Sequence, residues 1–248
     1  MCRHLAYVGA PVPLGALVSD PPHSLVRQSW APRQQDHGVV NADGFGIGWY
    51  VDGVDEPARH RAAGPIWADE TFLDLARVVR SGAVLAAVRS ATVGMAGGQS
   101  AAAPFRSGRW LFSHNGAVFG WPQMASRLAR GLDPGELARL EAPTDSALLW
   151  AMTRELLGRG QPPEAALTEV VARVVDAGGG RLTFLLTDGQ RIIATACGTS
   201  LYWRALRHGL VVASEPYDDD PAWVPVPDGS LLEADASGAV VTPLTPRV

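Results

Sequence analysis

The chain has 248 residues, of which 47% are hydrophobic and 19% are charged, so it can bury a large core and is neither disordered nor fibrous. Its formal net charge of -4 excludes the basic surface with which proteins neutralise the phosphates of nucleic acids. All 21 basic residues are arginine, which excludes Schiff-base, P-loop and Ser-Lys chemistry because each of these needs a lysine.

The cysteine count and the lengths of the apolar runs indicate the cellular environment. Cys2 and Cys197 are too few to build a disulfide framework, so a reducing cytoplasm is the expected location. Each apolar run is much shorter than the roughly 20 residues that a membrane-spanning helix needs. We therefore expect a soluble protein that binds neither membranes nor nucleic acids, and the sequence leaves a homo-oligomer open.

The first part of the chain predicts strands that alternate with one helix. Apolar runs bounded by glycine, proline or Asn-Ala-Asp-Gly signals predict strands at residues 3–8, 45–51 and 83–88. Apolar residues at helical spacing predict an amphipathic helix over residues 70–80. A glycine and alanine tract at residues 94–103 predicts an exposed loop before the next strand.

The second part predicts two neighbouring helices followed by several strands. A strand at residues 109–113 is expected to end at a turn over residues 114–116, because Asn-Gly is the strongest short turn signal. Thr144 can cap a helix over residues 144–157, and a second helix follows at residues 164–175. The remaining apolar runs predict an antiparallel meander with strands at residues 182–186, 192–196, 210–213 and 231–234.

Nothing in the sequence divides the chain into separate units. It contains no linker, no repeat of fixed period and no long low-complexity segment. Strand-rich parts with two helices between them predict a single domain of the α+β class over residues 2–248.

Cys2 is the candidate nucleophile. Removal of the initiator methionine would make it the N-terminal residue and would place a thiol and a free α-amino group on one carbon. Such an amino group titrates at about 7.7 to 8.0, so part of it is neutral at cellular pH and can accept the thiol proton. The alternative is a buried structural cysteine. A zinc site through Cys2 and His4 is not expected, because no second ligand pair accompanies them at suitable spacing.

Four further residues carry groups that could bind a charged substrate or stabilise an oxyanion. Arg89 closes a predicted strand, where its guanidinium could pair with a carboxylate. Asn115 and Gly116 offer a side-chain amide and an unhindered backbone N–H, the donors that an oxyanion hole needs. Asp145 follows the helix cap and could hold an ammonium group. Taken singly, such residues more often serve as solvated charges, turns or partners of a helix dipole.

Together, several motifs resemble, in the same order, the class II glutamine amidotransferase domain, which belongs to the N-terminal-nucleophile hydrolases. These motifs are Met1-Cys2-Arg3-His4, residues 41–50, Arg89-Ser90-Ala91-Thr92, residues 112–116 and Pro143-Thr144-Asp145-Ser146. The resemblance is specific from residue 2 to about residue 150 and continues more loosely through residues 213–216 to the end. Within the family, the opening run Cys-Arg-His-Leu-Ala-Tyr is most similar to members that hydrolyse a γ-glutamyl amide in ergothioneine biosynthesis.

The resemblance implies a four-layer αββα sandwich in which two antiparallel sheets lie between helix layers. The implied site residues are Cys2 as the nucleophile, Asn115 and Gly116 as the oxyanion hole, and Arg89, Thr92 and Asp145 as the substrate-binding set. Arg89 would pair with the α-carboxylate of a glutamyl group and Asp145 with its α-ammonium, with Thr92 as a nearby hydrogen-bonding residue. The resemblance implies neither a cofactor nor a metal ion.

On the leaving-group side, the sequence departs from the family. Many glutaminase domains have Asn, Thr or His before a Pro-Phe pair, whereas this chain has alanines at residues 101–103, and Val93 stands where some members have His. Trp223 is a candidate aromatic wall for a quaternary ammonium on the leaving amine, with a solvated acidic loop as the alternative. Cys197 lies in an apolar setting within a predicted strand, and we interpret it as part of the core.

The resemblance implies an amidohydrolase that cleaves a γ-glutamyl amide through a thioester on Cys2, with hercynylcysteine sulfoxide as the leaving amine. The sequence contains no synthase, phosphoribosyltransferase or ATP-binding segment that could use released ammonia, so we expect a free-standing enzyme. One alternative is a glutaminase subunit that hands ammonia to a separate synthase. The other is an inactive glutamyl-binding module, against which the complete set of candidate site residues argues.

Overall fold

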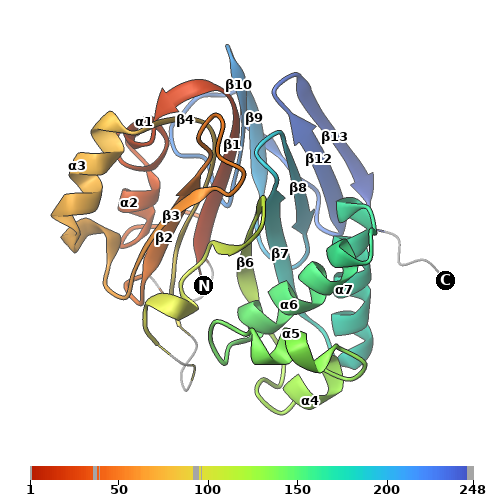
Figure 1. Ribbon diagram of the computed structural model, residues 1–248. Coiled ribbons are helices and arrows are strands. Elements are labelled where there is room, and N and C mark those ends of the chain that lie inside the picture. The colour runs from red at the N-terminus through yellow and green to blue at the C-terminus, as the bar shows by residue number, and fades with distance from the viewer. Residues whose placement is uncertain (1, 36–37, 39, 92–94, 96, 245–248) are drawn as a thin grey trace.

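The computed structural model describes residues 2–35, 38, 40–91, 95 and 97–244. The strands of these residues form two antiparallel sheets that lie face to face (Figure 1). The first sheet contains β1 (Arg3–Pro13), β2 (Phe45–Trp49), β3 (Ala58–Ala62), β4 (Arg80–Val88), β9 (Tyr202–Leu206), β10 (Gly209–Ala213) and β11 (Val224–Pro225). Its strand order is β11-β9-β10-β1-β4-β2-β3, so the N-terminal strand lies near the middle of the sheet.

The second sheet consists of six strands, all of which follow residue 104 in the chain. It contains β5 (Phe105–Ser107), β6 (Trp110–Val118), β7 (Gly180–Thr187), β8 (Arg191–Ala196), β12 (Ser230–Asp235) and β13 (Gly238–Pro243). The strand order is β13-β12-β8-β7-β6-β5. Two internal strands, β1 and β6, therefore carry the N-terminal motif and the Asn-Gly motif on different sheets.

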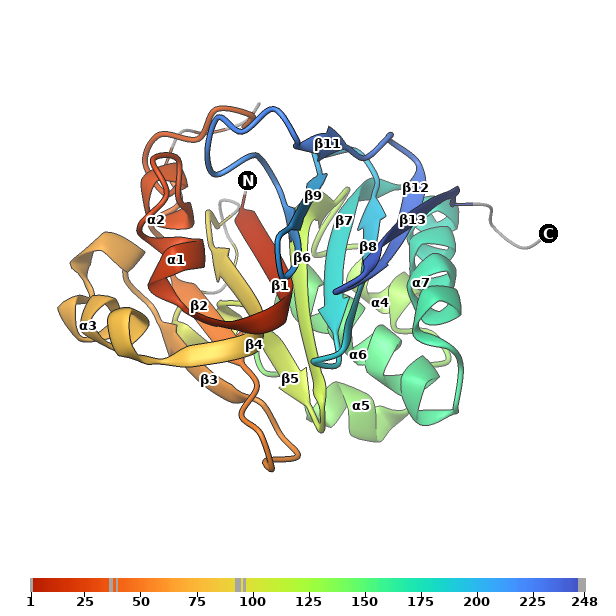
Figure 2. The ribbon, with the colours of Figure 1, turned by 90° about the horizontal axis from the view of Figure 1, so that it is seen from above.

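Helices cover the outer face of each sheet, as Figure 2 shows from above. The first sheet is covered by α1 (Gly15–Val18), α2 (Leu25–Gln28) and α3 (Glu70–Val78), and the second by α4 (Ala125–Leu128), α5 (Pro134–Ala138), α6 (Asp145–Gly158) and α7 (Pro163–Ala177). Two 3-10 turns, η1 (Ile66–Ala68) and η2 (Gln99–Ala101), lie in the connections. The expected four-layer αββα sandwich is confirmed. In the described part of the chain, no helix combines the length and apolar character that crossing a membrane requires.

The core consists of three apolar layers, because each sheet has two buried faces. On β1, Tyr7 packs toward the outer helices, whereas its neighbours Ala6 and Val8 lie between the sheets. The sheets approach closely where β2 has glycine: a Cβ on Gly48 would lie 2.6 Å from Leu111 Cδ1 on the opposite sheet. The absence of a side chain at Gly48 thus allows the two sheets to meet.

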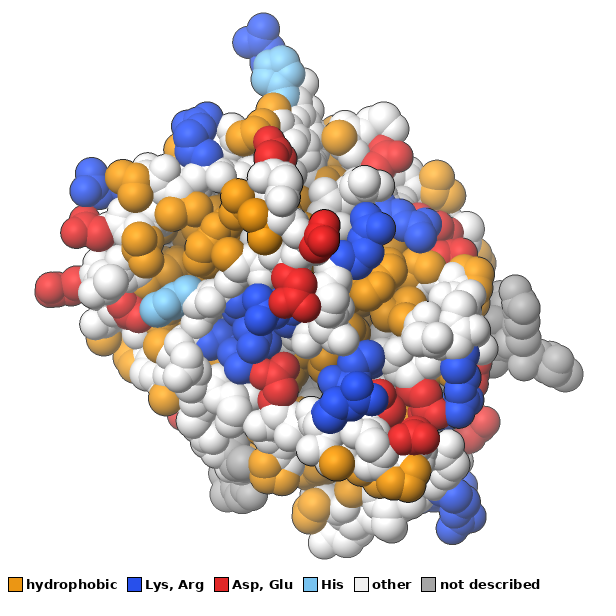
Figure 3. All heavy atoms as spheres, viewed as in Figure 1, with side chains coloured by type: hydrophobic (Ala, Val, Ile, Leu, Met, Phe, Trp, Pro, Cys, Tyr) orange, Lys and Arg blue, Asp and Glu red, His pale blue; other side chains and the backbone are white. Residues whose placement is uncertain are grey.

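The surface carries charges of both signs. On the face drawn in Figure 3, arginine side chains alternate with acidic ones, and several apolar areas lie between them.

Helices α6 and α7 confirm the two neighbouring helices that the sequence predicts, but two strand predictions are wrong. The strand expected to end at residue 113 continues through the predicted turn to Val118, which pairs with Gly180 on β7. The expected meander is divided, because β7, β8 and β12 enter one sheet and β9 and β10 the other. Alternation of buried side chains is the same in either sheet, so local sequence does not determine which sheet a strand joins.

Candidate active site

Cys2 lies at the start of β1, beside the end of β4. The strand register pairs Arg3 with Val88, so Cys2 and Arg89 are the next residues along two neighbouring strands. Cys2 Sγ lies 3.9 Å from the carbonyl oxygen of Ser90. Cys2 and Arg89 line one small pocket, whose other lining residues are Ala87, Val88, Ala101, Ala103, Phe105, His114 and Ser146. The candidate nucleophile and the candidate carboxylate-binding arginine therefore face the same space.

Strand alternation directs the Cys2 side chain toward the second sheet. On β1, Ala6 lies between the sheets, whereas Leu5 packs against the outer helices. Cys2 and His4 share the face of Ala6, because side chains two residues apart point the same way along a strand. His4 Nδ1 lies 3.0 Å from Ser113 Oγ on β6, which joins the nucleophile strand to the opposite sheet.

Arg89 is held by the loop that precedes β2. Its backbone N–H donates to Gly44 O at 2.8 Å, and its Nη1 donates to Asp43 O at 3.3 Å. The Asp43 carboxylate accepts a hydrogen bond from the backbone N–H of Ala91 at 2.7 Å. The residue is only 8% exposed, and its planar guanidinium is held beside the pocket, where it can receive a carboxylate.

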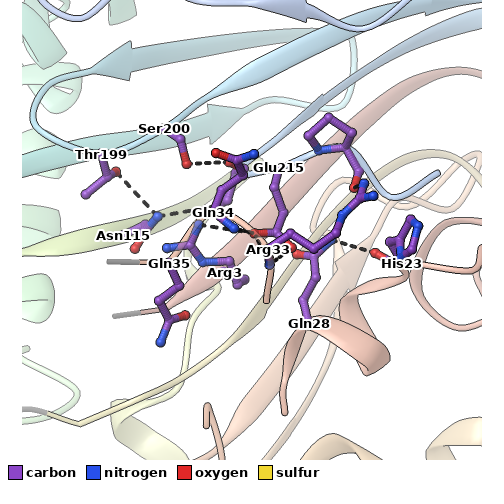
Figure 4. A network of polar contacts seen from close by, with 12 residues as sticks. Arg3, His23, Gln28, Arg33, Gln34, Gln35, Asn115, Thr199, Ser200 and Glu215 are labelled. Atoms are coloured by element: carbon purple, nitrogen blue, oxygen red, sulfur yellow. Dashed lines mark hydrogen bonds and ion pairs between the residues drawn. The ribbon is translucent and has the colours of Figure 1, made fainter. Parts of the chain in front are cut away.

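Asn115 and Gly116 lie within β6, not in a turn. Asn115 Nδ2 lies 3.4 Å from Thr199 Oγ1 and 3.3 Å from Ser214 Oγ, while Oδ1 is buried with no hydrogen-bond partner among the described residues. Figure 4 shows the Asn115 amide beside Thr199. At Gly116, a Cβ would lie 1.8 Å from Arg181 O, so this position needs glycine. The requirement comes from close packing against β7, and the Asn-Gly pair is therefore no hairpin signal here.

Asp145 begins α6, as the sequence predicts. Thr144 is the N-cap, and its hydroxyl accepts a hydrogen bond from the backbone N–H of Ala147. The Asp145 carboxylate accepts the N–H of Val118 at 3.0 Å through Oδ2 and the N–H of Ser146 at 2.7 Å through Oδ1. With 3% exposure, this carboxylate is a fixed negative charge between the second sheet and its helix layer.

His114 and Ser146 belong to the same corner, and the sequence analysis assigned no role to either. His114 Nε2 donates to Arg181 O at 2.9 Å, and Nδ1 lies 2.9 Å from Ser146 Oγ. Burial lowers the pKa of His114, and the nearby Asp145 carboxylate partly opposes that shift. A neutral imidazole leaves the negative charge of Asp145 available to a substrate cation. The sequence does contain a signal for both residues, because each lies inside one of the motifs that carry the family resemblance.

A second group that sequence reasoning missed lies behind the nucleophile strand. Arg3 Nη1 and Glu215 Oε2 are 3.8 Å apart in the interior. The Glu215 carboxylate also accepts the backbone N–H groups of Arg33 at 3.0 Å and Gln34 at 2.8 Å, as drawn in Figure 4. Glu215 thus joins the residue after Cys2 to the loop that follows α2.

Thr92 and Val93 lie outside the described residues, as does Met1. Cys197 directly follows β8 and is not within a strand, contrary to the prediction; it is half-buried against the core, and burial raises its pKa. Among residues 2–35, 38, 40–91, 95 and 97–244, no group of three or more His, Cys, Asp or Glu side chains is placed to hold a metal ion.

Trp223 has partners within its own part of the protein. The Arg204 guanidinium lies 4.9 Å from the centre of its ring, and the indole Nε1 donates to Asp218 at 2.8 Å. Tyr217 meets the ring edge-on at 5.0 Å. These contacts give Trp223 a structural role in the acidic loop that carries Asp218, Asp219 and Asp220.

Known proteins match the chain in both sequence and structure. The family model of class-II glutamine amidotransferases matches residues 14–209. The gamma-glutamyl-hercynylcysteine sulfoxide hydrolase of Mycolicibacterium smegmatis is 44% identical over 246 residues, which cover 98% of this chain and 100% of that protein. The protein of the same name from Mycobacterium tuberculosis is 42% identical over 245 residues, with 98% and 97% coverage.

Among solved structures, a glutamine aminotransferase class-II domain protein from Silicibacter pomeroyi matches with a TM-score of 0.73 and 27% sequence identity. The match covers 99% of this chain and 100% of that one. The family model spans far more than half of the sequence, and the named relatives span nearly all of it. The chain therefore belongs to the class II glutamine amidotransferase family.

Proposed function

We propose that this chain hydrolyses γ-glutamyl-hercynylcysteine sulfoxide to glutamate and hercynylcysteine sulfoxide. The observation that carries the proposal is the 44% identity over 98% of the chain to a relative that bears this activity in its name. Hydrolysis of an amide bond is the activity that the two named relatives share. The proposal goes further because it names the substrate of this chain.

The glutamyl end of this substrate is a zwitterion next to a reactive amide. Arg89 supplies a fixed guanidinium beside Cys2, and we assign it to the α-carboxylate. Asp145 supplies a buried carboxylate for the α-ammonium, with two backbone N–H groups that hold it in place. We also assign Thr92 to this end, on the strength of its place in the Arg-Ser-Ala-Thr motif. One cation and one anion at fixed positions orient the γ-carbonyl toward the thiol.

The reaction proceeds through an acyl-enzyme. With Met1 removed, the α-amino group of Cys2 accepts the thiol proton, and Sγ forms a bond to the γ-carbon. Asn115 Nδ2 and the backbone N–H of Gly116 donate to the oxyanion. When the C–N bond breaks, the amine leaves with a proton from the Cys2 ammonium, and a thioester remains. A water molecule, activated by the same amino group, then hydrolyses the thioester and releases glutamate.

A substrate comparison tests the proposal. Purified enzyme is given γ-glutamyl-hercynylcysteine sulfoxide, the unoxidised thioether or free glutamine, and kcat/KM is measured from glutamate release, with Cys2→Ala as the blank. We expect the highest kcat/KM on the sulfoxide. Preference for free glutamine, with turnover that depends on an added synthase, would instead identify a glutaminase subunit.

A further inference from the structure

Ser214 is tied to the nucleophile strand. It directly follows β10 and is fully buried. Its backbone N–H donates to His4 O at 2.9 Å, and its hydroxyl oxygen accepts the backbone N–H of His4 at 3.0 Å. Ser214 is therefore held on both its backbone and its side chain by a residue only two positions after Cys2.

The same hydroxyl reaches the opposite sheet. Ser214 Oγ lies 3.3 Å from Asn115 Nδ2, and Thr199 Oγ1 lies 3.4 Å from the same nitrogen. The Thr199 hydroxyl is itself fixed by Thr183 Oγ1 at 2.6 Å. Two buried or half-buried hydroxyls thus hold one end of the Asn115 amide, and one of them is anchored to the strand of the nucleophile.

The two ends of the amide differ in their partners. The nitrogen has two hydroxyl neighbours, whereas Oδ1 is buried without a hydrogen-bond partner among the described residues. An oxyanion can be stabilised by an N–H and not by a carbonyl oxygen. A hydroxyl group has one proton to donate and can also accept, so a half-turn of the amide can keep both contacts. Ser214 then donates to Oδ1. Thr199, whose hydroxyl donates to Thr183 Oγ1 before the half-turn, turns its proton to Oδ1, and the Thr183 hydroxyl turns from the Thr199 backbone oxygen to donate to Thr199 Oγ1. The half-turn places the NH₂ group where the partnerless oxygen was.

We propose that Ser214 and Thr199 are positioning residues for the oxyanion hole. During acylation their hydroxyls donate to Asn115 Oδ1 and direct Nδ2 toward the substrate carbonyl, and the contacts of Ser214 with His4 set the Asn115 amide relative to Cys2. The inference rests on the proposed function, because it requires Asn115 to be an oxyanion donor.

A double-mutant cycle tests the proposal in the full-length enzyme. Ser214→Ala is expected to lower kcat by roughly tenfold or more and to change KM by less than about twofold, because the amide acts on the transition state and not on the bound substrate. Thr199→Val is expected to lower kcat in the same way, and Thr199→Ser to restore it. Ser200→Ala is the matched control, since the Ser200 hydroxyl donates to the backbone oxygen of Ser214 and not to Asn115.

The decisive arm repeats Ser214→Ala and Thr199→Val in an Asn115→Ala background. Positioning through Asn115 predicts that neither substitution lowers kcat further once the amide is gone. An equal further loss in that background overturns the proposal, as does a Ser214→Ala enzyme that folds and keeps its kcat. If Ser214→Ala does not fold, the Thr199→Val and Thr199→Ser variants test the proposal by the same criteria. An Asn115→Ala enzyme with normal kcat would instead overturn the oxyanion role of Asn115.

Discussion

Arg3 and Glu215 face each other across 3.8 Å in the interior, and neither side chain is exposed to solvent. A buried charge that loses its opposite charge pays a large desolvation penalty, whereas an exposed pair is screened by water. Glu215 also accepts backbone N–H groups from the loop after α2. The carboxylate therefore stabilises both the nucleophile strand and this loop.

We predict that Glu215→Ala lowers the free energy of unfolding by about 3–5 kcal/mol, the range for removing one partner of a buried ion pair. Urea unfolding followed by circular dichroism measures the change. Asp219→Ala is the matched control in the same loop, because the Asp219 side chain is 74% exposed although it pairs with Arg33. A similar loss in both variants would show that the loop as a whole, and not the buried charge, is responsible.

The active protein is predicted to begin at Cys2. An amide-blocked nitrogen cannot accept a proton at neutral pH, so a chain that keeps Met1 has no base on the nucleophile residue. The test measures the intact mass and the activity of each fraction of the purified enzyme and compares the two. Full activity in a fraction that retains Met1 would rule out the N-terminal-nucleophile mechanism.

Cys2 is predicted to be the cysteine that reacts with 6-diazo-5-oxo-norleucine. Burial raises the pKa of the Cys197 thiol, and the nearby Asp228 adds to this effect, so little reactive thiolate forms there. Peptide mapping after inactivation identifies the labelled residue. Cys2→Ala is expected to lose turnover while retaining substrate binding by calorimetry. Labelling at Cys197 alone, with loss of activity, would contradict the assignment.

Arg89→Ala and Asp145→Ala are each predicted to lower kcat/KM by the equivalent of about 2–5 kcal/mol, because each leaves a substrate charge unpaired in a partly dry pocket. Arg89→Lys is expected to restore little, since a point charge does not reproduce the planar guanidinium. Steady-state kinetics on the sulfoxide substrate give the values. Arg80→Ala, an exposed arginine at the other end of β4, is the control. Wild-type kcat/KM in Arg89→Ala would exclude it from substrate binding.

The protein is predicted to lose stability as the pH falls from 7 toward 5. Burial lowers the pKa of His4, as does the neighbouring Arg3, and burial lowers the pKa of His114. In the unfolded chain these groups titrate at about 6.5, so below that pH the unfolded state binds more protons and the free energy of unfolding falls. The loss is at most about 1.4 kcal/mol per pH unit for each histidine.

Urea unfolding at pH 7 and pH 5.5 measures this dependence. His114→Gln is expected to reduce the difference between the two pH values, whereas His208→Gln, on an exposed turn, is expected to leave it unchanged. An unchanged difference in His114→Gln would mean that other groups cause the pH dependence.

The sequence by itself determined the features that depend on neighbouring residues. Cys2 is recognised by its place after the initiator methionine, and Asp145 by its place after a threonine that caps a helix. Arg89 follows an apolar strand whose end is visible in the sequence. Hydrophobic periodicity and helix capping act over a few residues, so strands and the two long helices could be predicted without a structure. The roles of the candidate site residues were assigned from the motifs that resemble the family, and they stay predictions.

Only the tertiary structure decided which distant groups meet. Ser214 reaches His4 because β10 pairs with β1, and it reaches Asn115 because the sheets that carry these strands lie face to face. Glu215, which lies two residues after the end of β10, meets Arg3 because β10 pairs with β1. The Asn-Gly pair lies in a strand and not in a turn because β6 pairs with β7 along this stretch, and its glycine is required by the close approach of Arg181 O. Contacts between residues some two hundred positions apart leave no periodic trace in either segment, so local sequence patterns do not predict them.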